Sequence, residues 1–175
     1  DNIQSGESNT LRQMCAERNI PTRNELILGL PKQTYQSFVN TLMQAIPPYP
    51  KHDFALFLCR LLDNTELANP TEQEQNKIET RRCLWVSPKG RNYGVIDEFQ
   101  KIIVSTQDMS LEKWKQTYRF AYFVNMGYNK NLMRMIFRFV RDLWKIQLQN
   151  YIEYIVHAMR HAEPSSAFGK LWSIF

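Results

Sequence analysis

The chain has 175 residues, a net charge of +5, 43% apolar residues and 22% charged residues. Its length suits one domain or a domain with an appendage, and its apolar content is high enough to exclude wholesale disorder. The longest uncharged apolar runs, such as residues 54–59, are far shorter than the roughly 20 residues of a membrane span. The polar N-terminus has no signal-peptide core, and three cysteines cannot all pair within one chain, so we expect a cytoplasmic protein. Because the first residue is Asp rather than Met, we expect a piece of a longer protein.

The charge divides the chain into two parts. Residues 1–87 carry 9 basic and 10 acidic side chains, whereas residues 88–175 carry 13 and 7. The change coincides with a stretch of turn and loop residues, Ser-Pro-Lys-Gly-Arg-Asn-Tyr-Gly, at positions 87–94. We therefore predict two units, residues 1–87 and residues 88–175.

The first unit alternates predicted helices and strands. Residues 10–19 and 33–46 show helical apolar spacing, and residues 25–29 and 54–59 are short apolar runs typical of buried strands. The order helix, strand, helix, strand with short loops predicts a parallel α/β sheet. Two strands are too few for such a sheet, so we expect the other strands to come from the rest of a longer chain or from a partner chain.

Ligands of parallel α/β proteins bind at the carboxyl ends of the strands. Here the first end is Gly29-Leu30-Pro31 and the second runs from Arg60 to Glu66. A glycine at this position lets a ligand approach the backbone closely, or it serves a tight strand-to-helix turn.

Several segments, in this order, resemble radical S-adenosylmethionine (SAM) enzymes. Ile20-Pro21-Thr22, the run from Glu25 to Pro31 and the run from Thr34 to Phe38 resemble the family's fifth-strand region. Leu-Leu-Asp-Asn-Thr-Glu-Leu-Ala-Asn-Pro at residues 61–70 resembles the segment after the sixth strand in the cobalamin-binding branch. Residues 105–123, with Met-Ser-Leu-Glu-Lys-Trp at 109–114, are similar to the start of that branch's helical C-terminal region.

The resemblance implies an α/β fold, with the C-terminal strands and helices of a partial (β/α) TIM-like barrel in residues 1–87. A mostly α-helical C-terminal region, the cap, follows in residues 88–175. The whole enzyme would also contain an N-terminal cobalamin-binding domain and a 4Fe–4S cluster on a Cys-x3-Cys-x2-Cys loop. Such a cluster cleaves SAM to a 5′-deoxyadenosyl radical, and many members of the branch then use methylcobalamin to methylate an unactivated carbon.

The cluster loop and the cobalamin domain are absent from these residues. The three cysteines, Cys15, Cys59 and Cys83, are separated by 43 and 23 residues, which suits small buried side chains or inert thiols. We therefore expect the chain alone to be inactive and to bind none of SAM, the cluster and cobalamin stably. The expected partner is the missing N-terminal half or a chain that completes the sheet.

By the same resemblance, four residues belong to the SAM pocket. Glu25 reaches the methionyl amino group or the ribose, Ile27 and Gly29 pack near the adenine, and Arg60 offers backbone groups to the adenine edge. Glu25 could instead pair with Arg23 or Arg12. We predict no catalytic residue and no metal ligand in this chain.

One segment departs from the family pattern. Many members read Gly-Leu-Pro-Gly-Glu-Thr after the fifth strand, whereas this chain has Lys32 and Gln33 in place of the second glycine and the glutamate. These differences remove a negative charge and add a positive one beside the expected ligand.

The second unit is predicted to be mostly helical. One short strand is expected within residues 92–106, followed by a helix that Ser110 caps. Aromatic residues of that helix, Tyr118, Tyr122 and Phe123, could line the substrate side of the site or belong to an ordinary helix core. A long helix is expected over residues 129–149, with more helix up to residue 162.

A basic row is the main rival signal. On the predicted helix over residues 129–149, cations recur every three or four positions; they are Lys130, Arg134, Arg138, Arg141 and Lys145. The row could bind nucleic acid phosphates or an anionic membrane surface, face solvent, or contact the missing half of the enzyme. The alternative to an enzyme fragment is therefore a non-enzymatic binding or assembly module whose basic helix contacts an anionic partner.

Other catalytic and metal motifs are weak or missing. His157 and His161 are four residues apart, a spacing that can bind a metal but also suits two boundary histidines. No Gly-x-Ser-x-Gly elbow or phosphate-binding loop is present in the sequence.

Overall fold

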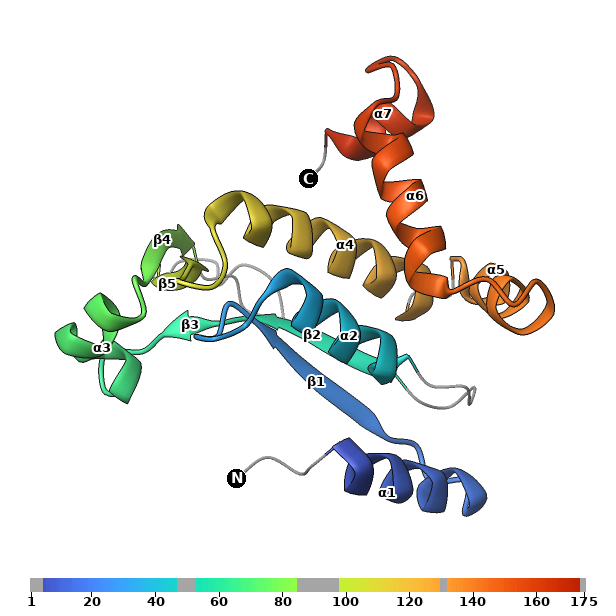
Figure 1. Ribbon diagram of the computed structural model, residues 1–175, viewed down its shortest axis with the longest axis horizontal. Helices are drawn as coiled ribbons and strands as arrows, with labels where there is room; N and C mark the ends of the chain where they lie inside the picture. The colour runs from blue at the N-terminus through green and yellow to red at the C-terminus, as the bar shows by residue number, and fades with distance from the viewer. Residues whose placement is uncertain (1–4, 47–52, 85–97, 130–131, 174–175) are drawn as a thin grey trace. The chain divides into compact units, whose positions relative to one another are not determined.

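We describe a computed structural model of the chain, which covers residues 5–46, 53–84, 98–129 and 132–173. The fold is mixed α/β, and every described element after β5 is helical (Figure 1). The elements in chain order are α1 (Ser5–Glu17), β1 (Arg23–Leu28), α2 (Tyr35–Ala45), β2 (Asp53–Leu58), β3 (Arg60–Leu61), the 3-10 helix η1 (Glu66–Ala68), α3 (Pro70–Gln75), β4 (Glu79–Leu84), β5 (Phe99–Ser105), α4 (Leu111–Asn129), α5 (Arg134–Arg138), the π-helix η2 (Phe139–Leu143), α6 (Leu148–Arg160) and α7 (Ala167–Trp172).

β1 and β2 form a two-stranded parallel sheet, as the sequence predicts. The N–H of Asp53 donates to the carbonyl of Thr22, and six residues further along both strands the N–H of Cys59 donates to the carbonyl of Leu28. Because both hydrogen bonds advance in the same direction, the strands are parallel.

α2 begins with a reciprocal cap. The N–H of Thr34 donates to Ser37 Oγ at 2.9 Å, and the N–H of Ser37 donates to Thr34 Oγ1 at 3.1 Å. These two bonds satisfy amide donors that the first turn of a helix leaves unpaired. Phe38, Val39 and Leu42 then form the buried stripe that the spacing predicts.

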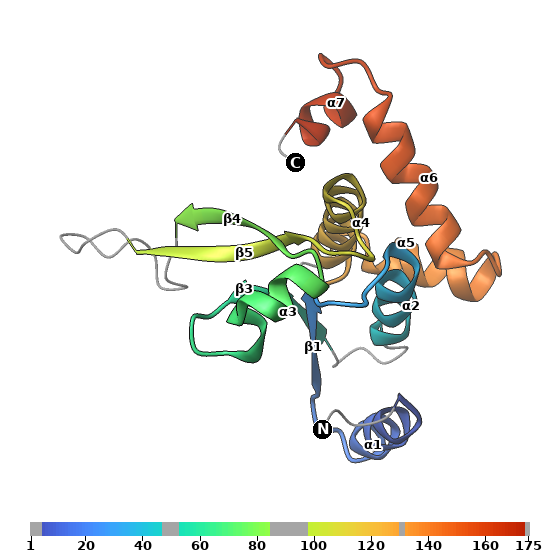
Figure 2. The same ribbon diagram turned by 60° about the vertical axis from the view of Figure 1, so that its left-hand side comes forward.

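A second sheet is antiparallel, with the strand order β3-β5-β4 (Figure 2). The sequence predicts β5 through its apolar run Ile102-Ile103-Val104 but misses β4, which reads Glu-Thr-Arg-Arg-Cys-Leu. β4 shows no apolar alternation because most of its side chains are exposed, and its strand conformation depends on pairing with β5. β3 continues almost directly from β2, and its Arg60 is the register partner of Ile102.

The described residues form two compact units, and each takes segments from both sides of residue 87. Unit 1 comprises Asp1–Leu26, Val39–Leu56 and Arg119–Phe175, and unit 2 comprises Ile27–Phe38 and Phe57–Tyr118. Each unit has fully buried side chains of its own, such as Phe54, Phe120 and Phe137 in unit 1 and Leu28 and Ile103 in unit 2. The predicted division at residues 87–88 stays a prediction, and its loop at 87–94 lies outside the described residues.

The prediction of one continuous helix over residues 129–149 is wrong in the middle of that range. α5 passes directly into the π-helix η2, which ends at Leu143, and α6 begins only at Leu148. In this segment the N–H of Trp144 donates to the carbonyl of Phe139, five residues earlier, and Lys145 has a φ of 55°. A residue in the left-handed region cannot continue a right-handed helix, so the chain changes direction there.

The partial barrel stays a prediction. The described strands make two small sheets, and they form no closed barrel. None of the described helices is long and apolar enough to cross a membrane.

Candidate cofactor site at the ends of β1 and β2

Glu25 and Ile27 lie on the same, exposed side of β1. Their neighbours Leu26 and Leu28 are buried, so the strand alternates as predicted. The basic residues that could have paired with Glu25 are engaged elsewhere: Arg23 Nε lies 3.6 Å from Asp53 Oδ1, and Arg12 donates to the carbonyl of Gln44. The carboxylate of Glu25 is thus exposed beside an exposed aliphatic side chain.

Gly29 ends β1 in a conformation that other residues rarely adopt. Its φ is 106°, and a Cβ added to it would lie 2.8 Å from the carbonyl oxygen of Ile103. The same Cβ would lie 3.4 Å from Cys59 Cβ and 3.4 Å from Trp114 Nε1. The glycine therefore permits close packing of the end of β1 against β5 and Trp114.

The turn after Gly29 is braced by the side chain of Gln33. Its Oε1 accepts a hydrogen bond from the N–H of Gly29 at 2.9 Å, and its Nε2 donates to the carbonyl of Ile27 at 3.0 Å. An amide can make both bonds, whereas a carboxylate could only accept the first. The glutamine at this departure from the family pattern thus has a structural role in this chain.

Lys32 occupies a backbone conformation that glycine favours. Its φ is 63°. This is the position at which the family pattern Gly-Leu-Pro-Gly-Glu-Thr has its second glycine, and only glycine enters the left-handed region without a steric cost. The turn thus retains a backbone shape suited to glycine, although its residue is lysine.

Trp114 brings an unsatisfied donor to this turn. The side chain is 8% exposed, and its Nε1–H has no hydrogen-bond acceptor among the described residues. Its ring stacks on Tyr118 with the centroids 5.4 Å apart. A buried, unpaired N–H is costly, so this indole is suited to donate to a ligand atom or a water molecule.

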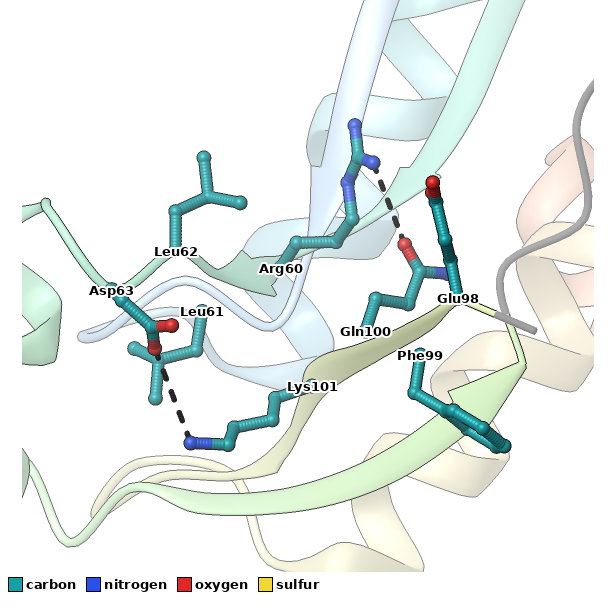
Figure 3. A pocket seen from close by; sticks show the side chains of 8 residues that line it. All are labelled: Arg60, Leu61, Leu62, Asp63, Glu98, Phe99, Gln100 and Lys101. Atoms are coloured by element: carbon teal, nitrogen blue, oxygen red, sulfur yellow. Dashed lines mark hydrogen bonds and ion pairs between the residues drawn. The ribbon is translucent and has the colours of Figure 1, made fainter. Parts of the chain in front are cut away.

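Arg60 lines an open pocket of about 450 Å³ (Figure 3). Its guanidinium donates to Gln100 Oε1 at 3.4 Å, and on the other side of the pocket Lys101 Nζ lies 4.0 Å from Asp63 Oδ1. Phe99 contributes an exposed ring, over which Arg82 stacks at 3.9 Å. The pocket thus offers two cations, carboxylates and an aromatic ring, a set suited to a zwitterionic or polar ligand.

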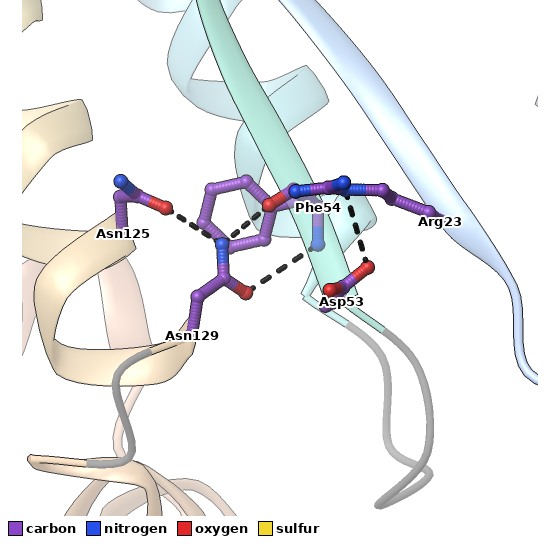
Figure 4. Close-up of polar contacts among 5 residues, drawn as sticks. All are labelled: Arg23, Asp53, Phe54, Asn125 and Asn129. Carbon is purple, nitrogen blue, oxygen red and sulfur yellow. Dashed lines mark hydrogen bonds and ion pairs between the residues drawn. The ribbon is translucent and has the colours of Figure 1, made fainter. Parts of the chain in front are cut away.

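In unit 1, a side-chain amide binds the backbone of Phe54 at the edge of β2 that faces away from β1. The amide of Asn129, at the end of α4, donates to the carbonyl of Phe54 and accepts from its N–H at 3.4 Å (Figure 4). Asn125 Oδ1 accepts from Asn129 Nδ2 at 2.6 Å and holds that amide in place. At this point the edge of β2 that faces away from β1 is thus closed by a side-chain amide.

The three cysteines are unsuited to a 4Fe–4S cluster. Cys59 is buried, Cys15 belongs to α1 and Cys83 to β4, and no group of three metal-ligand side chains gathers among the described residues. Burial raises the pKa of the Cys59 thiol, which opposes the thiolate that iron would need. The residues present therefore do not fit the cluster.

The basic row does not form one continuous helical face. Arg134 donates to Tyr128 Oη at 3.1 Å, and Arg141 forms two hydrogen bonds with Asp142, at 2.6 Å and 3.1 Å. The Arg141 hydrogen bond lowers the pKa of Asp142, and Arg138 and Lys145 lower it further, so a stable negative charge lies within the row. Lys130 lies outside the described residues.

The other predicted candidates lie in ordinary structural surroundings. His157 and His161 have their ring centroids 4.4 Å apart on exposed positions of α6 and at its end. Phe123 packs against buried Phe137 at 6.4 Å, and Tyr118 is the stacking partner of Trp114.

The bracing amide of Gln33 and the roles of Trp114 and Asn129 were not predicted from the sequence. A signal existed for the first, because a glutamine directly after a strand end can reach back to the strand. The partners of Trp114 and Asn129 lie 85 and 75 positions away in sequence and left no local signal.

The comparisons with known proteins point in the same direction as the sequence resemblance. No family model matches the chain. The chain is similar to the cobalamin-dependent radical SAM methyltransferase TokK of Streptomyces tokunonensis, with 27% identity over 163 residues. The match covers 93% of this chain but 24% of that methyltransferase, so the chain spans about a quarter of the length of its relative. This similarity supports a radical SAM-related role at the level of the family.

Proposed function

We propose that the chain is the C-terminal part of a cobalamin-dependent-type radical SAM enzyme, which carries out methyl transfer or related radical chemistry. The observation that carries the proposal is the match over 93% of the chain to a methyltransferase of that type. The parallel pairing of β1 and β2, joined through α2, supports it because barrel strands are parallel and linked in this way. Residues 1–87 would then contribute to the partial barrel, and residues 88–175 to the helical cap.

Within that enzyme, the exposed side of β1 and the turn after it would form one side of the SAM pocket. The carboxylate of Glu25 suits an ammonium group or two hydroxyls, and Ile27 beside it suits an apolar ring. Gly29, Lys32 and Gln33 fix the turn, and the unpaired N–H of Trp114 lies next to it. These residues fit SAM as a ligand, and Arg60 would act through its pocket at the end of β2.

The iron–sulfur cluster and cobalamin would be held by the rest of the enzyme. Those cofactors supply the radical and methyl-transfer chemistry when bound, while this chain's residues bind and orient SAM and keep water out. The remaining strands of the barrel would pair at β1, where Arg23 and Glu25 turn their backbone groups outward.

Two experiments test the proposal. Reading the coding sequence upstream of residue 1 should reveal Cys-x3-Cys-x2-Cys within roughly 150 residues. The alternative, a non-enzymatic assembly module, predicts no such motif, and its absence would refute the enzyme proposal. Anaerobic reconstitution of the 175-residue chain with iron and sulfide should leave it without a cluster, whereas the whole protein should take one up.

A matched pair of variants tests the SAM side. In the whole protein, Glu25→Gln should weaken SAM binding about tenfold, because it removes a charge-assisted contact to the ligand. Glu79→Gln, which changes an exposed carboxylate of β4, should leave the affinity unchanged. Equal affinities of the two variants and the wild type would remove Glu25 from the proposed pocket.

A further inference from the structure

The segment from Leu132 to Ile146 exposes an unusual amount of apolar surface in unit 1. Met135 is 83% exposed, Leu132 68% and Leu143 66%. The exposed apolar side chains of this segment define the 132–146 surface; they are Leu132, Met135, Ile136, Phe139, Leu143, Trp144 and Ile146. A contiguous run of large exposed apolar residues marks an interaction site rather than ordinary protein surface.

These residues form one side of α5 and η2, opposite a buried side. Leu132, Met135, Ile136 and Phe139 follow the spacing of one helical face, while Phe137 and Val140 are buried. Phe137 packs edge-on against Tyr151 of α6, which fixes α5 through its inner side. The exposed side therefore remains available to a partner, although the buried side of the segment already packs in the core of unit 1.

The surface carries a preformed aromatic anchor. The rings of Phe139 and Trp144 meet edge to face, with their centroids 5.0 Å apart, and both remain about half exposed. The π-helical turn between them sets this contact, because Trp144 bonds back to Phe139. Aromatic residues at the centre of an exposed patch, together with adaptable methionine, are typical of protein interfaces.

The charges around the surface favour a protein over a membrane or a nucleic acid. Arg134 is held on the Tyr128 ring and Arg141 is bound to Asp142, so two of the cations already have partners in the chain. Arg138 and Lys145 are exposed, and both lower the pKa of Asp142 through their positive charges. A mainly apolar centre with a mixed polar rim matches a protein partner that bears apolar side chains and a few carboxylates.

We propose that the 132–146 surface docks onto the part of the whole enzyme that lies outside these 175 residues. The proposal rests on the proposed function, since the chain spans about a quarter of the relative's length and the remainder would be the nearest large protein surface. The docking partner would present an apolar groove for Met135, Leu143 and the Phe139–Trp144 pair, with carboxylates facing Arg138 and Lys145. The surface is then an internal interface of the enzyme.

Oxidation of Met135 provides a test that does not depend on catalysis. Dilute hydrogen peroxide converts an accessible methionine to its sulfoxide, and mass spectrometry follows the rate for each methionine. We expect Met135 to be oxidised about tenfold more slowly in the whole protein than in the 175-residue chain, because docking buries its thioether. In the whole protein, Leu143→Glu should restore most of the rate at Met135, whereas Phe168→Glu, at a half-exposed position of α7, should not.

The other outcomes would each overturn the proposal. Equal oxidation rates in the chain and in the whole protein would show that nothing covers the surface. Protection only when phosphatidylglycerol vesicles are added would assign the surface to a membrane, and protection in the chain alone that grows with its concentration would assign it to self-association.

Protected Met135 in a whole protein that leaves SAM intact would uphold the docking and refute the proposed function, whereas exposed Met135 in a protein that cleaves SAM would do the reverse.

Discussion

Gly29→Ala should destabilise the chain strongly, although it adds only a methyl group. The new Cβ would lie 2.8 Å from the carbonyl oxygen of Ile103, a fully buried residue of β5, and the backbone would keep a φ of 106°. Holding an alanine in the left-handed region costs about 1–2 kcal/mol. Forcing apart a packed strand contact costs a further 1–3 kcal/mol or so. Reduced freedom of the unfolded chain offsets about 0.4–1 kcal/mol of this.

The net loss in the free energy of unfolding is therefore about 1–5 kcal/mol. Urea unfolding followed by circular dichroism measures it, and the midpoint should fall without a large change in slope. Leu30→Ala, at the next and more exposed position, serves as the control and should cost less than about 1 kcal/mol. A Gly29→Ala protein within about 0.5 kcal/mol of the wild type would refute the argument that this turn is packed against β5.

Three further predictions concern the same region. The Lys32→Gly protein should be about 1 kcal/mol more stable than the Lys32→Ala protein, because glycine removes the strain of a φ of 63°. Equal urea midpoints of the two variants would contradict this. Gln33→Glu should cost about 1–2 kcal/mol at neutral pH, since the carboxylate cannot donate to the carbonyl of Ile27 and faces it instead. A Gln33→Glu protein with the same urea midpoint as the wild type would count against the bracing role. Iodoacetamide should modify Cys59 more slowly than Cys15 or Cys83 in the native chain, because burial raises the pKa of its thiol and shields it; equal rates measured by mass spectrometry would contradict that placement.

The sequence predicted those elements whose own side chains determine them. The apolar stripe of α2 matches its burial, and β1 and β2 form strands as predicted, although apolar Ile27 and Phe57 are exposed. Ser110 caps α4 through a bond from the N–H of Lys113 at 3.4 Å. β4 could not be predicted in this way, because its charged sequence becomes a strand only by pairing with β5 across many residues. The π-helical turn was also beyond reach, because the apolar and basic spacing of residues 132–146 is equally consistent with a continuous α-helix.

The candidate site shows the same division. The alternation that places Glu25 and Ile27 together is a local property of a strand and was predicted from the sequence. The close approach of Ile103 and Trp114 to Gly29 depends on contacts between residues more than 70 positions apart. The departure at Lys32 and Gln33 was visible in the sequence, but its physical meaning required the backbone angle of one residue and the two hydrogen bonds of the other.

The proposed function requires that this chain belongs to an enzyme that cleaves SAM reductively. The most direct measurement is the release of 5′-deoxyadenosine by the whole protein after anaerobic reconstitution with iron and sulfide, with a reductant, SAM and cobalamin present. We expect 5′-deoxyadenosine to accumulate with the whole protein and not with the 175-residue chain alone. A whole protein that takes up no cluster, or that takes up a full complement of iron and sulfide and still leaves SAM intact, would contradict it.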